Sequence, residues 1–184
     1  MQTYKLKNNK TLEVTQDESP YNPREDDNLS TMVCFHGRYS LGDKHEYSSN
    51  DYSGWDEMEK AIIKNEKTAI ILPLYLYNHS GITISTTEFS CPWDSGQIGF
   101  VFVSKEKLKT EYSVKKITQQ IIEKATKVLL AEVKIYDQYI SGEVYSYTLL
   151  DENGKVEDSC SGFFGCDIKT NGILDSIDAE LVEG

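Results

Sequence analysis

The sequence predicts an α+β fold, in which an antiparallel sheet of about 5–7 strands carries one long amphipathic helix and one or two shorter helices. Three observations lead to this prediction. Short apolar runs alternate with turn residues in the way that β-hairpins require. Apolar residues also recur at near-helical spacing along a segment that ends at Ile140. Finally, a chain of 184 residues has the length of one domain, so we expect residues 1–184 to form a single globular domain.

Residues 1–30 are expected to form a loosely structured N-terminal arm. The apolar residues Tyr4, Leu6, Leu12 and Val14 are enough for only a short edge hairpin. Two prolines follow at positions 20 and 23. Because proline fixes φ and has no N–H to donate, we expect no regular element at that point.

Six further segments have the length and composition of β-strands. Two of them flank the turn Asn78–Gly81 and two flank the turn Asp151–Gly154, so each pair is predicted to form an antiparallel hairpin. Pro73, inside one segment, indicates a bulge or an edge position, because proline cannot donate to the ladder. The six segments are Thr31–His36, Thr68–Tyr77, Ile82–Thr87, Gln97–Val103, Val144–Leu150 and Lys155–Phe164.

Two short helices are predicted, one before the central strands and one near the end of the sequence. The first begins near Trp55, after a polar loop over residues 38–53. Asp51 or Ser53 can act as its N-cap, because a side-chain oxygen there accepts from the free N–H groups of the first turn. The second is acidic and covers Leu174–Leu181.

The longest helix is predicted to run from Ser104 or Ser113 to Ile140, and Ser141-Gly142 ends it. Its first half contains the one concentration of lysine in an acidic sequence. The predicted core face of this helix consists of Val114, Ile117, Ile121, Ala125, Val128, Val133, Tyr136 and Ile140.

The net charge of −11 is unevenly distributed, with acidic clusters in residues 13–27 and 151–184. A field of this sign repels phosphate backbones and attracts basic surfaces. We therefore expect no direct nucleic-acid binding, but a partner protein with a basic nucleic-acid-binding surface. The alternative is that the acidity only keeps the protein soluble. The predicted partner-binding carboxylates are Glu152, Glu157, Asp158, Asp175 and Asp178.

The stretch Cys91–Gly99 places Trp, Asp, Ser and Gln in a short loop between two predicted strands. Loops held by rigid strands are common sites of function. Trp93 and Asp94 are predicted to contact a partner, because a partly exposed Trp with polar neighbours is a typical interface anchor. The alternative is structural: Trp93 closes the end of the core and Asp94 makes an Asx turn.

An enzymatic alternative uses His79, Cys91 and Asp94, which together could supply a base, a nucleophile and an orienting acid. Successive hairpin turns lie at opposite ends of a sheet unless a strand is crossed or skipped, and this weakens the case that His79 meets Asp94. No nucleophile signature surrounds Cys91. We therefore expect a protein that is not an enzyme, with a small hydrolase or small-molecule-binding protein that uses residues 78–99 as the alternative.

Neither a metal site nor a cofactor is predicted. The four cysteines lack the C-x-x-C spacing of zinc and redox motifs and are expected to be free thiols. Cys34, His36, His45 and His79 do not form two ligand pairs at metal spacing. No apolar run reaches the ~20 residues of a membrane span, and no secretory signal is recognised. We expect a cytoplasmic location.

The motifs Tyr77–Ile82 (YNHSGI) and Phe89–Phe100 (FSCPWDSGQIGF) resemble those of small uncharacterised proteins from bacteriophages, prophages and plasmids. The resemblance covers about residues 70–145 and leaves both acidic clusters outside. It implies a mobile-element setting, in which small acidic proteins often inhibit host defence. Together with the charge, it leads us to expect a non-enzymatic phage-type inhibitor, of the anti-CRISPR or anti-restriction kind, that binds a basic surface of a host nucleic-acid-handling defence protein.

Overall fold

The computed structural model describes residues 1–7, 9–178 and 180–181. The chain divides into two compact units, unit 1 with Met1–Asn22 and Gln138–Gly184, and unit 2 with Pro23–Asp137. The prediction of an α+β fold is confirmed. The prediction of one sheet with about 5–7 strands is wrong, because the described part of each unit contains its own four-stranded sheet. The expectation of a single domain stays a prediction.

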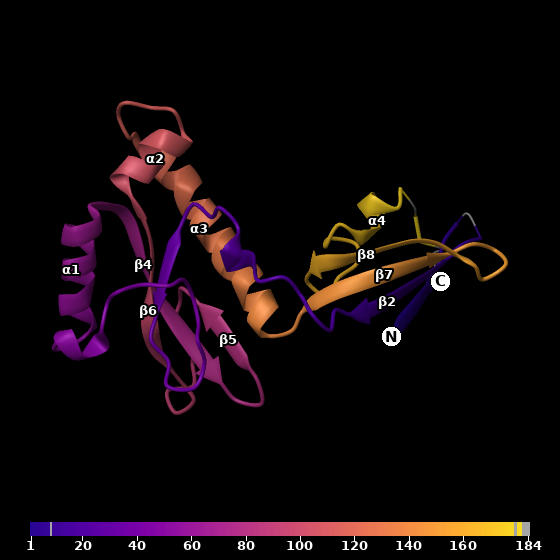
Figure 1. Cartoon of the computed structure of the whole chain (residues 1–184), viewed down its shortest axis with the longest axis horizontal. Coiled ribbons are helices and arrows are strands. Elements are labelled where there is room, and N and C mark those ends of the chain that lie inside the picture. Colours follow the sequence, from indigo (N-terminus) through magenta and orange to yellow (C-terminus); the bar gives the residue numbers. More distant parts are fainter. Residues whose placement is uncertain (8, 179, 182–184) are drawn as a thin grey trace. The chain divides into compact units, whose positions relative to one another are not determined.

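Unit 1 joins two hairpins that lie far apart in the sequence. β1 (Gln2–Lys5) pairs with β2 (Thr11–Gln16), and β7 (Val144–Leu150) pairs with β8 (Val156–Phe164). β2 and β7 pair with each other, so the antiparallel order is β1-β2-β7-β8. The short helix α4 (Ile173–Ser176) lies beside this sheet (Figure 1). The core of unit 1 consists of Leu6, Leu12, Val14, Tyr147, Leu149, Ile168 and Ile173.

The N-terminal hairpin forms as predicted, but it is part of this core and not of a loosely structured arm. Leu6 is 1% exposed and Leu12 0% exposed. These side chains are covered because Leu12 lies opposite Leu149 of β7, a partner from the other end of the sequence. The acidic helix predicted over residues 174–181 is also shorter than expected, since Leu181 forms an isolated β-bridge with Leu6.

The sheet of unit 2 has the order β3-β6-β4-β5. Its strands are β3 (Thr31–Cys34), β4 (Thr68–Asn78), β5 (Ile82–Ser85) and β6 (Ser95–Ser104). All pairings are antiparallel. β3 and β4 both run opposite to β6, toward the end of the sheet where β6 begins. β4 reaches Ser95 at the start of β6, whereas β3 ends opposite Gly99.

Pro73 lies in β4, which has neighbours on both sides for part of its length. It is opposite Phe100 of β6, whereas β5 pairs with β4 only over Tyr75–Asn78. At Pro73 itself the only paired neighbour is therefore β6, and the missing N–H falls where β4 is locally an edge. The predicted edge position is thus confirmed at this point of the strand.

Helices cover both faces of the unit 2 sheet (Figure 1). α1 (Trp55–Glu66) buries Met58 against one face. α2 (Lys105–Glu111) and α3 (Gln119–Ile140) lie on the other side of the sheet. The core beside α1 consists of Val33, Met58, Ile62, Phe100 and Phe102.

The long helix predicted from Ser104 or Ser113 to Ile140 is two helices. Ser104 caps α2, and its hydroxyl accepts a hydrogen bond from the backbone N of Lys107 at 3.1 Å. The chain leaves α2 before Ser113, whose φ of +50° is left-handed and cannot continue a helix. Val114 and Ile117 lie between α2 and α3 at near-helical spacing. Apolar periodicity therefore continues through the break and hides it.

Two further details of the helices differ from prediction. α3 buries Leu129, whereas Val128 of the predicted core face is 38% exposed. Adjacent apolar residues leave the rotation of a helix ambiguous.

Neither Asp51 nor Ser53 caps α1. The backbone N and the hydroxyl of Ser53 both donate to Glu57, each at 2.7 Å, and Asp51 ends a short 3-10 helix.

A buried ion network fixes the segment before β3. The side chain of Arg24 is 3% exposed, and it donates to both oxygens of Asp43 at 2.9 and 2.7 Å and to the carbonyl of Ser30 at 2.8 Å. Glu132 of α3 accepts from the backbone N of Leu29 and Ser30 at 2.7 and 3.0 Å. Its Oε2 also lies 3.6 Å from Nη1 of Arg24. The network therefore joins the first and the last segments of unit 2.

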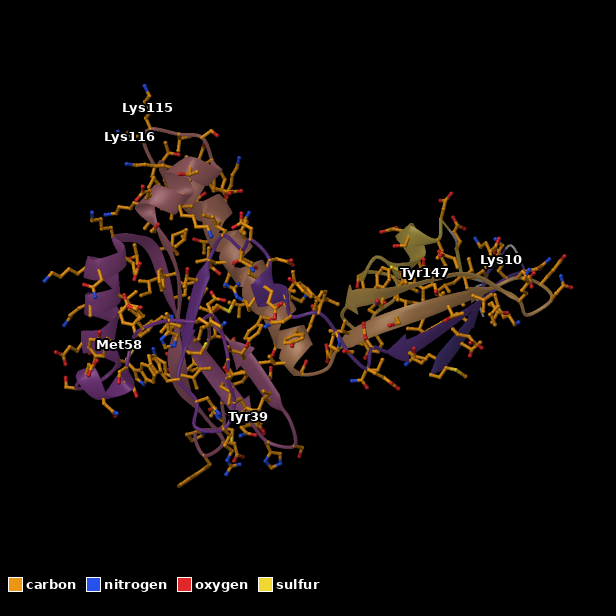
Figure 2. All side chains as sticks on the ribbon, in the orientation of Figure 1. Lys10, Tyr39, Met58, Lys115, Lys116 and Tyr147 are labelled. Atoms are coloured by element: carbon orange, nitrogen blue, oxygen red, sulfur yellow. The ribbon has the colours of Figure 1, made fainter. Side chains whose placement is uncertain are left out.

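The phenol of Tyr147 limits the stability of unit 1 at alkaline pH. Tyr147, labelled in Figure 2, is 3% exposed and donates to Oδ2 of Asp158 at 2.6 Å. Burial, and next the hydrogen bond to Asp158, raise the pKa of Tyr147 from 10.0 to about 12. Below pH 10 the phenol is neutral in both the folded and the unfolded state, so its contribution to the free energy of unfolding is fully present. Above pH 10 the unfolded state ionises first, and this contribution is lost as the pH rises to about 12.

We expect Tyr147→Phe to flatten this alkaline loss. The measurement is the urea midpoint of unfolding, followed by circular dichroism from about pH 8 to pH 12. The wild-type midpoint falls over this range, and the variant's midpoint falls less steeply. Tyr39→Phe is the control, because Tyr39 is 42% exposed in unit 2. Equal slopes for wild type and Tyr147→Phe would contradict the prediction.

Candidate functional site

The structure brings His79, Cys91 and Asp94 together at one end of the unit 2 sheet. β6 pairs with β4 on the side opposite β5, and Ser95 at the start of β6 faces Tyr77 near the end of β4. Oδ2 of Asp94 lies 3.3 Å from Nδ1 of His79 and 3.7 Å from Sγ of Cys91. The expectation that hairpin geometry separates His79 from Asp94 is therefore wrong, because the chain crosses β4 between β5 and β6.

The order of these three groups is not that of a catalytic triad. In a Cys–His–Asp triad the imidazole lies between the nucleophile and the acid, so that it can take the proton of the nucleophile. Here the carboxylate of Asp94 lies between Cys91 and His79 and contacts both through the same oxygen. The side chain of His79 is also 64% exposed. This arrangement stabilises a turn more readily than it activates a thiol.

The turn that contains Trp93 is held by several hydrogen bonds. The hydroxyl of Ser95 donates to the carbonyl of Cys91 at 2.5 Å, and the backbone N of Asn78 donates to the carbonyl of Asp94 at 2.8 Å. Trp93 itself is 93% exposed. The structural alternative, in which this indole closes the core, is therefore wrong. An exposed indole on a fixed turn is a preorganised apolar anchor, because little flexibility is lost on binding.

The five carboxylates predicted to bind a partner are all exposed and all lie in unit 1. Unit 1 carries thirteen Asp and Glu residues against five Lys, whereas unit 2 carries seventeen against fourteen Lys and Arg. Most of the net charge therefore belongs to unit 1. Trp93 and Asp94 belong to unit 2. Glu152 lies in the turn before β8, Glu157 and Asp158 lie on β8, Asp175 lies in α4, and Asp178 follows α4.

The strand β8 presents part of this charge at the edge of the sheet. Residues 156–162 are exposed, and β8 is the last strand in the order. Glu157 forms an ion pair with Lys10 at 2.5 Å, and Asp158 accepts from Tyr147. An exposed edge strand offers backbone groups to which another chain can add. Because the strand is acidic, it suits a basic partner better than a second copy of itself.

A cavity that the sequence did not predict lies in the loop that follows β3. Its volume is about 650 Å³, and residues of the segment 34–49 line it. A second cavity of about 470 Å³ lies next to it, and Lys44 and His45 line both. From the sequence, His36 and His45 were candidates only for metal ligands. The available signal was a long polar loop that contains two histidines, a lysine and two tyrosines.

In the part of the chain that the structure describes, no three His, Cys, Asp or Glu side chains are grouped so that they could hold a metal ion. None of the described helices has both the length and the apolar character needed to cross a membrane. Comparisons with protein-family models, with curated proteins and with solved structures find no match for this chain. The case for a function therefore depends on the side chains themselves.

Proposed function

We propose that this protein is a non-enzymatic inhibitor that covers a basic nucleic-acid-binding surface on a host defence protein. The observation that carries the proposal is the concentration of negative charge on unit 1, where thirteen carboxylates face only five lysines. Exposed carboxylates compete for the Lys and Arg residues that otherwise hold phosphates, and such association is fast and sensitive to salt. The motifs in residues 77–100, which resemble those of phage proteins, support an inhibitor of the anti-CRISPR or anti-restriction kind. We propose that it acts in the cytoplasm of a bacterial host.

In this proposal the two units have different roles. The edge strand β8, with Glu157 and Asp158, supplies acidic contacts and free backbone groups to an extended basic segment of the partner. Trp93 supplies a separate apolar anchor. The alternative, a small hydrolase or a small-molecule-binding protein that uses residues 78–99, has less support because Asp94 separates Cys91 from His79.

The test is DNA cleavage by a panel of RNA-guided and restriction endonucleases, with and without the protein. We expect inhibition of at least one nuclease, and this inhibition weakens as salt rises. Neutralising the unit 1 carboxylates is expected to weaken it at least about tenfold. The test variant carries Glu152→Gln, Glu157→Gln, Asp158→Asn, Asp175→Asn and Asp178→Asn.

A matched control neutralises five exposed carboxylates of unit 2 and changes the net charge by the same amount. It is expected to retain inhibition within about threefold of the wild type. Equal loss of inhibition in both variants would show that only the net charge matters. If the wild-type protein inhibited none of the nucleases at low or at moderate salt, the proposal would be overturned. The control variant carries Glu25→Gln, Asp26→Asn, Asp56→Asn, Glu106→Gln and Glu111→Gln.

A further inference from the structure

The loop cavity after β3 has properties that the proposed function does not use. Its volume of about 650 Å³ lies within the usual range for sites that hold small molecules. It lies at the end of unit 2 toward which β3 and β4 run, and Figure 2 shows Tyr39, one of its lining residues, at the end of this unit away from Lys115 and Lys116. The chemistry of its wall indicates what it can bind.

His36 lines this cavity and carries a ring N–H group. Its Nδ1 is 3.2 Å from the backbone N of Arg38 and 3.2 Å from that of Tyr39, and both N–H groups donate to it. The neutral ring must then carry its proton on Nε2, which is left to donate. The ring also stacks on Tyr39, with centroids 5.0 Å apart and an interplanar angle of 24°. In this stack His36 covers one face of the Tyr39 ring.

The acidic groups of the wall are neutralised or remain protonated. Asp43 is the one carboxylate among the described lining residues, and it accepts from Arg24 twice and from the backbone N of Met32 at 2.8 Å. Burial raises the pKa of the Cys34 thiol to about 12, so this group stays uncharged at neutral pH. The exposed amine of Lys44 also lines the cavity. The wall therefore presents donors and positive charge without an unpaired acid.

His45 also lines the cavity, but its second ring nitrogen is buried and has no hydrogen-bond partner among the described residues. Its Nε2 lies 3.2 Å from the carbonyl oxygen of Cys34, which can only accept, so Nε2 carries the proton. The buried Nδ1 is then a bare acceptor without a hydrogen-bond partner in the described structure. Because this nitrogen is buried, it does not contact a molecule bound in the cavity.

We propose that this cavity binds a small organic anion of the mononucleotide class. The phosphate accepts from Nε2 of His36 and pairs with Lys44, and the base lies against Tyr39. The hydroxyls of Ser40 and Ser49, which also line the cavity, are available to the ribose. Unit 2, which contains the cavity, is nearly balanced in charge, with seventeen acidic and fourteen basic residues, so its own charge opposes anion binding only weakly.

The test is calorimetric titration of the full chain with three probes: AMP, adenosine and inorganic phosphate. We expect saturable one-to-one binding of AMP that is at least about tenfold tighter than binding of either fragment, because the ring and the anion both contribute. His36→Asn places a side-chain oxygen near the position of Nδ1 and keeps an acceptor for the two backbone N–H groups, but removes the Nε2 donor. His36→Asn and Lys44→Gln should each weaken AMP binding about tenfold.

Lys60→Gln is the matched control, because Lys60 is an exposed lysine on α1 that does not line the cavity. It should bind AMP as the wild type does. AMP binding that is absent at millimolar concentration, or unchanged in His36→Asn and Lys44→Gln, would overturn the proposal. If phosphate bound as tightly as AMP, the proposed role of the aromatic ring would be overturned. If adenosine bound as tightly as AMP, the proposed role of the anion would be overturned. Tryptophan fluorescence checks that each variant is folded. The indole of Trp55 packs on Phe100, with ring centroids 5.9 Å apart, and unfolding would remove this contact.

Discussion

Replacement of Gly99 by alanine is expected to unfold unit 2 or to cost more than about 3 kcal/mol of its stability. A Cβ at this position would lie 1.8 Å from the carbonyl oxygen of Val33 and 2.9 Å from its carbonyl carbon. Both are backbone atoms of the neighbouring strand β3. No change of rotamer can relieve such a contact, so β3 must separate from β6. The measurement is urea unfolding followed by tryptophan fluorescence, since Trp55 and Trp93 both lie in unit 2.

Gly96→Ala is the control for Gly99→Ala. Gly96 lies in the same strand, and a Cβ at this position would meet nothing within 4 Å. We expect its free energy of unfolding to change by less than about 1 kcal/mol. Similar stability for the two variants would show that β3 and β6 do not approach each other as closely as the structure indicates.

Arg24→Met is expected to lower the free energy of unfolding of unit 2 by about 3–5 kcal/mol. Methionine keeps much of the apolar stem but removes the donors to Asp43 and Ser30. Asp43 then remains partly buried as a charge without its cationic partner, and removing one member of a buried pair is the costly case. The same fluorescence measurement of urea unfolding reports this loss.

Arg38→Met is the matched control, because Arg38 is the other arginine of the chain and is exposed. Its replacement should change the free energy of unfolding by less than about 0.5 kcal/mol. If the two arginine variants proved equally stable, the network around Arg24 would contribute nothing to unit 2. Asp43→Asn, combined with Arg24→Met, should recover part of the loss by removing the unpaired charge.

Local elements were predictable because they depend on neighbouring residues. Apolar runs identified β4 and β6, the Asp151–Gly154 turn identified the β7–β8 hairpin, and Trp55 marked the start of α1. The bounds of these four strands are close to prediction. The break between α2 and α3 was not predictable from apolar spacing, because Val114 and Ile117 continue the helical period across it.

Pairing between distant segments was not predictable, because the residue pattern of a strand does not specify the strand with which it pairs. β2 pairs with β7 near the other end of the sequence, and this pairing divides eight strands into two sheets. The Gly99 contact with Val33 depends on the β3–β6 pairing and is invisible in the sequence for the same reason.

The residues of the candidate site were predicted more successfully than their arrangement. His79, Cys91 and Asp94 do meet, although simple hairpin geometry argued against it. They meet because the chain crosses β4 between β5 and β6, which lie on opposite sides of β4. The exposure of Trp93 was ambiguous, since an indole in a short loop can equally close a core. The cavity near His36 was missed because it depends on how a long polar loop folds back on itself.

The division of the chain also has a consequence for the order in which the protein folds during synthesis. Unit 1 is interrupted by the whole of unit 2, so β2 leaves the ribosome long before its partner β7. Unit 2 is continuous in the sequence, so all of its strands have left the ribosome before β7 is made. Closing a long disordered loop costs about 0.6 kcal/mol for each doubling of its length. By holding Arg24 near Glu132, folded unit 2 replaces that loop with a short closed connection, and thus prepares the late pairing of β2 with β7.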